Sequence, residues 1–481
     1  MGNSARVDSV ESRFQRCRET LESRGQGHVL RWWGELDGRQ REHLLSEIES
    51  VRWSELDPLI ETHVRNKPQV QAPTGLEPAP VWPRVPNADQ AALYREAAEL
   101  GQELIRSGKV AAFTVAGGQG MRLGFNGPKG AFPITPVRRK TLFQLFAETI
   151  LAVRARYDVE IRWYIMTSPA NHEQTITFFR EYDYFGLGAE TVRLFEQGML
   201  PMFSLDGRVL LTDKHKLALG PDGHGGSLKA LATGGALRDM QSRGVEIISY
   251  FQVDNPLVKP FDPLFIGLHA QNHSDMSTKV TPKVDDFERV GNVCLQDDRV
   301  VVIEYSSFPE HLARARNSDG SRKFDAGNLA IHLLKVEFVD SIAGQRLELP
   351  YHRSEKAVPC LNDDGLPVQP EDPNAVKLET FVFDALPLAE HTLVLEIDRA
   401  EEFSPVKNAK GADSVGTVIR DQIRRAARWL AAAGVPVPRT ANGEPDATIE
   451  IAPSYALDSE DVKAQAALPA SVHRGEQLYL S

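Results

Sequence analysis

Hydrophobic residues in the middle of the chain alternate between strand-like and helix-like patterns. Residues 110–115 and 161–166 are short, largely apolar runs, as in strands that are buried on both faces of a sheet. Between them, residues 141–156 place apolar side chains three and four positions apart, which predicts an amphipathic helix. A third apolar run covers residues 247–253. This alternation predicts a parallel sheet with right-handed crossovers, so ligand-binding loops are expected after the carboxyl ends of the strands.

The two flanks of this region carry other patterns. Up to about residue 65, apolar residues recur every three or four positions in two segments, which predicts helices. A proline-rich stretch then favours an extended connector, and residues 89–107 predict a further helix. Beyond residue 412 an amphipathic helix, with Ile419, Ile423, Ala426 and Leu430 on its apolar face, precedes short strand-like segments. We therefore expect an N-terminal helical region with the connector (1–88), a central α/β region (89–408) and a small C-terminal α+β domain (409–481).

Composition narrows the class of protein. With 481 residues, 42% hydrophobic and 25% charged, the chain is typical of a globular protein with more than one domain or with appendages. A net charge of −11 argues against a general nucleic-acid binder. Three widely spaced cysteines, Cys17, Cys294 and Cys360, argue against a disulfide framework and for a reducing compartment. No apolar run of membrane-spanning length and no signal-peptide pattern occur, so we expect a cytoplasmic protein without a membrane partner.

The loop after the first strand carries the most specific chemistry. It reads AGGQGMRLGFNGPKG and combines four closely spaced glycines with the cations Arg122 and Lys129. Glycines let bare N–H groups approach a ligand, and such a loop suits a polyphosphate. It is not a P-loop, because Lys129 is followed by Gly130, and not a dinucleotide fingerprint, because Leu123 stands where glycine is needed. An ordinary glycine-rich turn is the less favoured alternative.

Polar residues in later loops extend this picture. Gln197 could contact a base edge through its amide, or it could be a solvated turn residue. Residues 221–226 open a helix at Ser227 and form a potential anion or ribose site. Asp254 ends a buried strand and is well placed to hold Mg²⁺ on a triphosphate, although it could merely cap a turn. Glu304 is an acceptor and Asn328 a mixed donor and acceptor, so both could bind hydroxyl groups, although for Glu304 the residues alone favour a surface strand position.

Several of these segments, taken in order, resemble one known family. AGGQGMRLG with PKG, FEQGMLP, VDN, DAGN, KLETFVFD and EFSPVKN are similar to segments of the nucleotide-sugar pyrophosphorylases, above all the UDP-N-acetylhexosamine branch of the UDP-sugar pyrophosphorylases. The resemblance covers roughly residues 89–408 and implies an α/β, Rossmann-like nucleotidyltransferase (GT-A-like) domain, with a mixed sheet and helices on both faces. The implied reaction converts UTP and a sugar 1-phosphate, most simply N-acetylglucosamine 1-phosphate, into UDP-sugar and pyrophosphate, with Mg²⁺ as cofactor.

The resemblance also implies roles for individual residues. It assigns catalysis to Arg122, Lys129 and Lys407, and the metal ion to Asp254. The residues implied to bind UTP are Val115, Ala116, Gly117, Gly118, Lys129, Gln197, Gly223, Asp254 and Lys377, and those implied to bind the sugar are His224, Gly291, Glu304, Tyr305, Asn328, Phe381 and Phe383. The expected enzyme is a monomer or a weak oligomer.

One position divides the sugar prediction. His224 lies in GHGG, where the N-acetylhexosamine branch typically has asparagine and the glucose-1-phosphate enzymes have histidine. An imidazole could crowd an acetamido group or bond to a hydroxyl instead, so glucose 1-phosphate, or a broad range of sugar 1-phosphates, is the alternative.

Other interpretations stay open beside the enzyme. A nicotinamide-dependent oxidoreductase is disfavoured by Leu123, and a non-catalytic UDP-sugar-binding protein by the retained cations and Asp254. Phe381 and Phe383 could form one face of a strand. His269 and His273, spaced i, i+4 without the glutamate of a zinc motif, favour a solvated helix face.

Overall fold

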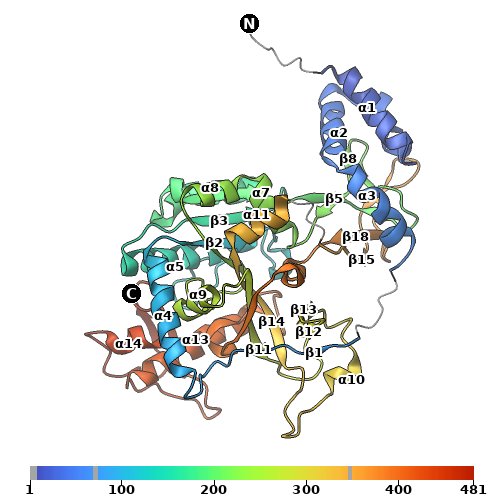
Figure 1. Cartoon of the computed structure of the whole chain (residues 1–481). Coiled ribbons are helices and arrows are strands. Elements are labelled where there is room, and N and C mark those ends of the chain that lie inside the picture. Colours follow the sequence, from blue (N-terminus) through green and yellow to red (C-terminus); the bar gives the residue numbers. More distant parts are fainter. Residues whose placement is uncertain (1–7, 69–73, 345–348) are drawn as a thin grey trace. The chain divides into compact units, whose positions relative to one another are not determined.

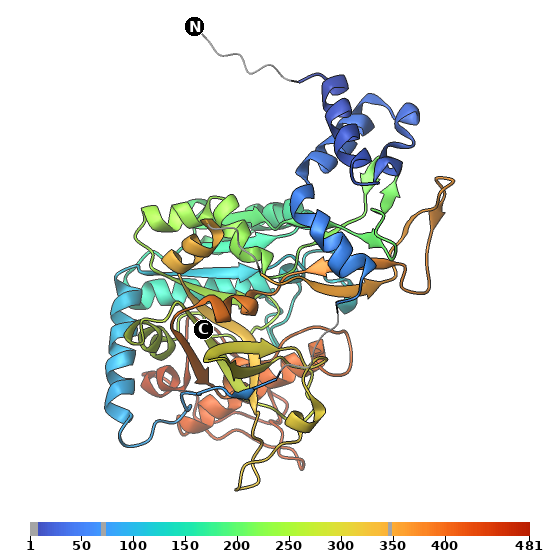
Figure 2. The same ribbon diagram turned by 45° about the vertical axis from the view of Figure 1, so that its right-hand side comes forward.

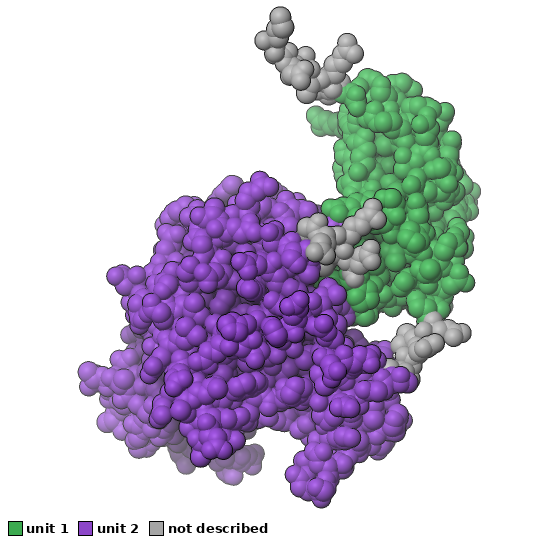
Figure 3. Space-filling view, viewed as in Figure 1, with its two compact units in different colours: residues 1–71, 198–226, 348–382 green, residues 72–197, 227–347, 383–481 purple. Residues whose placement is uncertain are grey.

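The computed structural model describes residues 8–68, 74–344 and 349–481. It forms two compact units (Figure 3). Unit 1 comprises Met1–Gln71, Gly198–Gly226 and Glu348–Val382, and unit 2 comprises Ala72–Gln197, Ser227–Leu347 and Phe383–Ser481. The boundaries 1–88, 89–408 and 409–481 expected from the sequence divide the chain by another criterion and stay a prediction.

A mixed sheet is the centre of unit 2 (Figure 1). Within the described ranges it has ten strands, with the main order β1-β12-β14-β10-β2-β3-β4. Strands β10, β2, β3 and β4 run parallel, as the sequence predicts, and β14 then pairs antiparallel with β10. The parallel strands are β2 (Val110–Val115), β3 (Trp163–Thr167), β4 (Val192–Glu196) and β10 (Ile247–Gln252). The others are β1 (Glu77–Pro78), β11 (Met276–Pro282), β12 (Asn292–Gln296), β13 (Arg299–Ile303), β14 (Ala326–Lys335) and β19 (Thr392–Glu396).

Helices cover both faces of this sheet. Trp163 and Tyr164 are neighbours in β3 and therefore point to opposite faces. The Trp163 ring lies 6.1 Å from the Phe143 ring of α5, whereas the Tyr164 hydroxyl donates to Asp239 of α8 at 2.7 Å. The predicted helices at 89–107 and 141–156 are confirmed as α4 and α5. The helices of unit 2 before residue 345 are α4 (Ala91–Arg106), α5 (Leu142–Tyr157), α6 (His172–Glu181), α7 (Gly226–Thr233, from the last residue of unit 1), α8 (Ala236–Ser242), α9 (Pro263–Gln271), α10 (Glu310–Ala313) and α11 (Val336–Gly344).

Two glycines let α4 and α9 cross at backbone contact. A Cβ on Gly101 would lie 1.8 Å from the carbonyl oxygen of Pro263, and one on Gly267 would lie 1.6 Å from that of Ala97. No side chain fits at either position, so α9 and its N-cap residue Asp262 are held firmly against α4.

Unit 1 is assembled from three separate stretches of chain (Figure 2). Its N-terminal helices, confirmed as predicted, share a buried core with Phe203, Val209, Leu217, Val376 and Leu378 from the later stretches. The helices are α1 (Val10–Glu22), α2 (Gly38–Ser50) and α3 (Trp53–Leu59), followed by a π-helical turn at Ile60–Arg65. The strands are β5 (Met199–Pro201), β6 (Phe203–Ser204), β7 (Leu211–Asp213), β8 (Lys216–Leu217), β9 (Leu219–Pro221), β15 (His352–Lys356), β16 (Cys360–Leu361), β17 (Pro367–Val368) and β18 (Ala375–Glu379).

The last seventy residues form a small α+β region of unit 2, as predicted. Its core packs α13 against α14 and the parallel pair β20–β21. The buried face of α13 is centred on Val418, Gln422, Ala426 and Leu430, so the expected Ile419 and Ile423 lie at its margin and are only partly buried. The elements after residue 396 are α12 (Arg399–Glu402), α13 (Val415–Ala432), β20 (Thr448–Ile451), α14 (Ser459–Ala464) and β21 (Gln477–Leu480).

Two of the sequence interpretations are wrong. Strand β18 ends at Glu379, and Phe383 lies in a 3₁₀ helix, Val382–Leu388, so Phe381 and Phe383 do not form a strand face. His269 is buried, with its Nδ1 2.7 Å from Ser277 Oγ, and His273 follows the end of α9 with a φ of 47°, so the two do not share a solvated face.

The remaining structural expectations concern cysteines, metals and membranes. Cys17, Cys294 and Cys360 are free thiols in buried positions. In the described parts of the chain, no helix is long and apolar enough to cross a membrane, and no group of three or more His, Cys, Asp or Glu residues could hold a metal ion.

Candidate active site

The glycine loop is held by side chains from the end of the neighbouring strand. Asn171 Nδ2 donates to the carbonyl oxygens of Ala116 (2.9 Å) and Gly118 (3.1 Å), and Ser168 Oγ donates to that of Gly117 (2.8 Å). Among the described residues, none accepts a hydrogen bond from the N–H of Gly117 or Gly118. The carbonyls are thus tied down while these two N–H groups remain available to an anion, which is the arrangement of a phosphate-binding loop.

Gln197 lies directly against this loop. Its side chain is buried, and a Cβ on Gly117 would come within 2.7 Å of its Oε1. Its backbone N–H donates to the Thr167 carbonyl at 2.8 Å. Val115, the last residue of β2, and the buried Ala116 lead from the strand into the loop. Since Gln197 is buried against the loop, the alternative of a solvated turn glutamine is wrong.

Lys129 and Asp254, which are 125 residues apart in sequence, form an ion pair. Lys129 Nζ lies 3.1 Å from Asp254 Oδ2, and the two side chains are only 12% and 13% exposed. Asp254 stands just beyond the carboxyl end of β10, as predicted. Arg122 is exposed on the same loop as Lys129 and makes no hydrogen bond or ion pair with another described side chain. One cation is therefore fixed, and the other can turn toward a ligand.

The backbone around Lys407 is hydrogen-bonded to both Asp254 and Arg122. The N–H of Val406 donates to the Asp254 carbonyl at 2.8 Å, and that of Ala409 donates to the Arg122 carbonyl at 3.1 Å. Lys407 Nζ itself lies 3.3 Å from Asp413 Oδ2, and both side chains are more than 40% exposed. The structure thus brings together Arg122, Lys129, Asp254 and Lys407, three cations and one carboxylate, around a glycine loop.

Three of the predicted sugar-binding residues also meet within unit 2. A Cβ on Gly291 would lie 3.4 Å from Glu304 Oε1 and 3.8 Å from Asn328 Cβ, and the Asn328 N–H donates to the Gly291 carbonyl at 2.8 Å. Glu304 follows the end of β13, and Tyr305 beside it is 46% exposed. Phe383 is in unit 2 as well but is buried.

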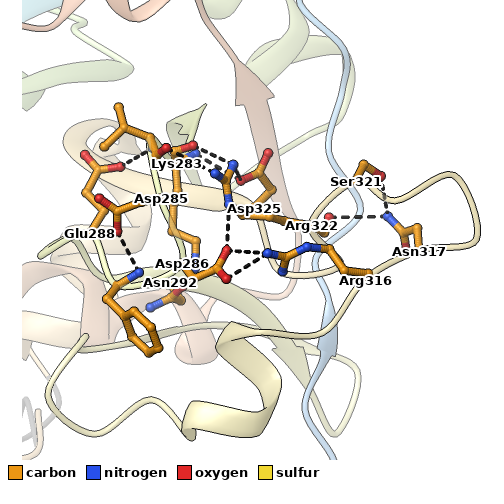
Figure 4. A network of polar contacts seen from close by, with 12 residues as sticks. Lys283, Asp285, Asp286, Glu288, Asn292, Arg316, Asn317, Ser321, Arg322 and Asp325 are labelled. Atoms are coloured by element: carbon orange, nitrogen blue, oxygen red, sulfur yellow. Dashed lines mark hydrogen bonds and ion pairs between the residues drawn. The ribbon is translucent and has the colours of Figure 1, made fainter.

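A polar network lies at the starts of β12 and β14, close in sequence to Gly291 and Asn328 (Figure 4). Asp286 accepts from Arg316 at 2.7 Å and from Arg322 at 3.1 Å, and Arg322 also reaches Asp325, which precedes β14, at 3.2 Å. Lys283 Nζ donates to Asn292 Oδ1 at 2.6 Å. Burial lowers the pKa of Lys283 below its usual value. The network fixes the starts of β12 and β14, and thereby Gly291, which precedes β12, and Asn328 in β14.

Unit 1 carries the other predicted residues. Gly223 has a φ of +86°, and a Cβ there would lie 2.3 Å from the Thr380 carbonyl oxygen. The N–H of Gly225 donates to that same oxygen at 2.8 Å. The GHGG segment and the residues after β18 therefore pack backbone to backbone, which explains the glycines. Lys377, in β18, pairs with Glu379 at 2.7 Å.

His224 is fixed as a neutral ring within this packing. Its Nδ1 accepts from the Val382 N–H at 3.0 Å, and its ring stacks on Phe381, with 5.1 Å between centroids. His352 stacks on Phe381 as well, at 4.2 Å. Burial, with a smaller contribution from the nearby His352, lowers the pKa of His224 to about 4. Because Nδ1 is an acceptor, the proton of the neutral ring is on Nε2.

Comparison with known proteins identifies the family. Residues 79–415 match the model of the UTP–glucose-1-phosphate uridylyltransferase family. The chain belongs to this family. It is 37% identical to human UDP-N-acetylhexosamine pyrophosphorylase-like protein 1 over 93% of this chain and 94% of that protein, and 35% identical to the UDP-N-acetylglucosamine pyrophosphorylase of Saccharomyces cerevisiae over 85% and 90%.

Solved structures agree with this uridylyltransferase assignment. The Entamoeba histolytica structure described as a putative UDP-N-acetylglucosamine pyrophosphorylase superposes with a TM-score of 0.73 at 32% identity, covering 84% of this chain and 98% of that one. The UDP-N-acetylglucosamine pyrophosphorylase of Trypanosoma brucei shares the fold with a TM-score of 0.82 at 24% identity, covering 99% of each chain. The protein is therefore a nucleotidyltransferase with the fold expected from the sequence.

Some residues of this uridylyltransferase site have no counterpart in the sequence predictions. Ser168 and Asn171 brace the glycine loop, and Asn255 binds the segment before Lys407. Ser168 and Asn171 follow a predicted strand, where ligand-binding loops are expected, so their position in the sequence could have marked them as site residues. Asn255 was within the VDN segment, but only the carboxylate beside it has evident metal chemistry.

Proposed function

We propose that the protein transfers the uridylyl group of UTP to N-acetylglucosamine 1-phosphate, giving UDP-N-acetylglucosamine and pyrophosphate. The observation that carries the proposal is the grouping of Arg122, Lys129 and Lys407 with Asp254 around the glycine loop. A triphosphate and a sugar phosphate together carry more negative charge than the three side chains carry positive charge. The substrates therefore offer a phosphate oxygen to each of these cations. The relatives named as UDP-N-acetylglucosamine pyrophosphorylases support this choice of sugar.

The chemistry needs no covalent enzyme intermediate. A sugar-phosphate oxygen attacks the α-phosphorus of UTP in line with the departing pyrophosphate. The N–H groups of Gly117 and Gly118 and the side chains of Arg122, Lys129 and Lys407 stabilise charge on the phosphoryl oxygens. The protein's contribution is thus positioning and preorganised positive charge.

Mg²⁺ is part of this proposal. Asp254 is a single carboxylate at the end of a strand, and no further metal-ligating cluster accompanies it in the described chain. This suits Mg²⁺, which is commonly held by one or two carboxylates together with substrate phosphates and water. Bound there, the ion would neutralise phosphate charge. Lys129, which lies 3.1 Å from Asp254 Oδ2, would share that carboxylate with the ion.

Glucose 1-phosphate is the second candidate sugar, and His224 is the observation that favours it. Its ring is locked by Val382 and Phe381, so a rigid imidazole stands where asparagine would place a smaller, two-sided amide. The predicted UTP and sugar roles of Gly223, Lys377, Phe381 and Phe383 belong to the proposal as well, as does a cytoplasmic monomer or weak oligomer.

A panel of sugar 1-phosphates tests the proposal. The protein is mixed with UTP, MgCl₂ and one sugar 1-phosphate at a time, and pyrophosphate release is followed with a coupled phosphate assay. N-acetylglucosamine 1-phosphate should give the highest kcat/KM, and excess EDTA should abolish turnover. No pyrophosphate release with any sugar 1-phosphate would refute the proposal, while a preference for glucose 1-phosphate would select the second candidate.

A further inference from the structure

The segment that leads to Lys407 is buried but has no regular secondary structure. It connects α12, which ends at Glu402, to α13, which begins at Val415. Ser404, Pro405 and Val406 are buried, so their backbone polar groups need partners inside the protein. Those partners decide where Lys407 is held.

One side chain supplies two of these partners. Asn255 Nδ2 donates to the Glu402 carbonyl at 2.7 Å, and Asn255 Oδ1 accepts from the Ser404 N–H at 3.0 Å. Two residues further on, the Val406 N–H donates to the carbonyl of Asp254 at 2.8 Å. The bonds fall on alternate residues, so the Asn255 amide and the Asp254 peptide together act as a short strand edge for the segment.

A buried ion triad anchors the start of the same segment. Lys279 of β11 is fully buried, with its Nζ 2.6 Å from Glu402 Oε2 and 2.7 Å from Asp262 Oδ2, the N-cap carboxylate of α9. Burial opposes the charged ammonium, but attraction to Asp262 and Glu402 outweighs it and raises the pKa of Lys279. Glu402 is therefore a fixed point, and the chain from it to Lys407 is braced at each second residue.

We infer that Asn255 is a positioning residue, which holds Lys407 at a set distance from Asp254 through these backbone bonds. The inference rests on the proposed roles of Lys407 and Asp254 in uridylyl transfer. Asn255 sits next to Asp254 in the chain, is 4% exposed, and also accepts from the Leu257 N–H at 3.3 Å. It thus couples the metal-binding turn to the segment that carries a catalytic cation, without touching substrate.

The chain offers a close match as a control. Gln26, also buried, donates from Nε2 to the Gly207 carbonyl and accepts at Oε1 from the Val209 N–H, both at 2.9 Å. This is the same amide bridge, to the carbonyl of one residue and the N–H of the second residue after it. It lies in unit 1, and the two residues to which its side chain bonds, Gly207 and Val209, are not among the proposed site residues. Gln26→Ala should therefore reproduce the loss of the two bridging hydrogen bonds without the loss of positioning.

The test compares Asn255→Ala, Gln26→Ala, Lys407→Ala and the double variant Asn255→Ala/Lys407→Ala. Asn255→Ala should lower kcat by about ten- to a hundredfold, because small displacements of a catalytic group are that costly. KM should change little, since no substrate contact is removed. In the Lys407→Ala background the same change should have almost no further effect, because the two residues act through one interaction. Gln26→Ala should keep the parent kcat.

Hydrogen exchange gives a readout that does not depend on turnover. In Asn255→Ala, amides of residues 403–409 should exchange faster than in the parent and in Gln26→Ala. Equal exchange there, or an Asn255→Ala loss that multiplies fully with the Lys407→Ala loss, would overturn the inference. An inactive parent enzyme would instead refute the proposed function, and the exchange comparison would still decide whether Asn255 holds residues 403–409.

Asn255→Asp serves if the alanine variant does not fold. It keeps the shape and the acceptor for Ser404 but cannot donate to the Glu402 carbonyl. It should show the same loss of kcat and the same faster exchange in residues 403–409. Parent-like values for both would overturn the inference as firmly as in the alanine variant.

Discussion

Replacing Lys129 by methionine would remove one charge and leave the packing of its side chain in place. Coulomb's law gives about 5 kcal/mol for unit charges 3.1 Å apart at an effective dielectric constant of about 20. Desolvation of both groups offsets most of this attraction, so losing the ion pair should lower the free energy of unfolding by about 1–3 kcal/mol. For catalysis, loss of one preorganised charge-stabilising group should lower kcat/KM by about a hundredfold.

The same variant has a second signature in the metal titration. With Lys129 gone, no ammonium competes for Asp254 Oδ2, so apparent Mg²⁺ affinity should rise while turnover falls. Arg122→Ala is the matched comparison, because Arg122 is exposed on the same loop and is not paired with Asp254. It should lower kcat/KM at least about tenfold and leave both the melting temperature and the Mg²⁺ titration as in the parent.

The assay is pyrophosphate release at saturating sugar 1-phosphate, with UTP and MgCl₂ titrated in turn, together with thermal unfolding of each variant. The reasoning fails if Lys129→Met keeps kcat/KM within about threefold of the parent. It also fails if Arg122→Ala and Lys129→Met shift the Mg²⁺ titration equally, because only Lys129 is in contact with the carboxylate.

Three further outcomes are expected. Asp254→Asn should weaken apparent Mg²⁺ affinity, because a hard cation with few protein ligands loses an anionic oxygen; a parent-like titration would place the ligand elsewhere. His224→Asn should shift the ratio of kcat/KM values toward N-acetylglucosamine 1-phosphate, by the equivalent of about 1–3 kcal/mol, and a shift toward glucose 1-phosphate would contradict the role of the ring. The stability of the same variant should depend less on pH than that of the parent. With a pKa of about 4, folded His224 stays neutral at pH values where the unfolded side chain, with a pKa near 6.5, takes up a proton. Its stabilising effect is complete above about pH 6.5 and is lost as pH falls toward 4, so the parent's melting temperature should drop more than the variant's between pH 7.5 and 5, and equal drops would rule this out.

The elements of the central sheet could be predicted because their signals are local. Residues 110–115 are a short apolar run followed by glycines, which predicts a strand, and the structure has that strand with the same bounds. The helix predicted at 141–156 likewise rests on a short-range pattern, and the structure has it as α5 with Thr141 as its N-cap. The position of Asp254 at a strand end follows from the same logic, and so does its closeness to the glycine loop of a parallel neighbour.

Long-range partners could not be predicted from these patterns. Phe381 and Phe383 have the period of a strand, but the Thr380 N–H bonds to the Asp222 carbonyl, 158 residues away, and ends the ladder. His269 looks exposed by its spacing, yet Ser277 on the next strand binds it in the core. The Asn255 bridge to Glu402 and Ser404 joins segments almost 150 residues apart, and a polar residue in a turn gives no sign of such a partner.

The three-part construction of unit 1 has a consequence for truncated or recombined forms of the enzyme. Removing the N-terminal helices would not yield a smaller autonomous enzyme, because Phe203, Val376 and Leu378 lose the apolar partners that cover them. Those residues belong to stretches that also carry Gly223, His224 and Lys377. A deletion or chimaera that exchanges only the first seventy residues must therefore match its new helices to this core, or it will expose an apolar surface to aggregation.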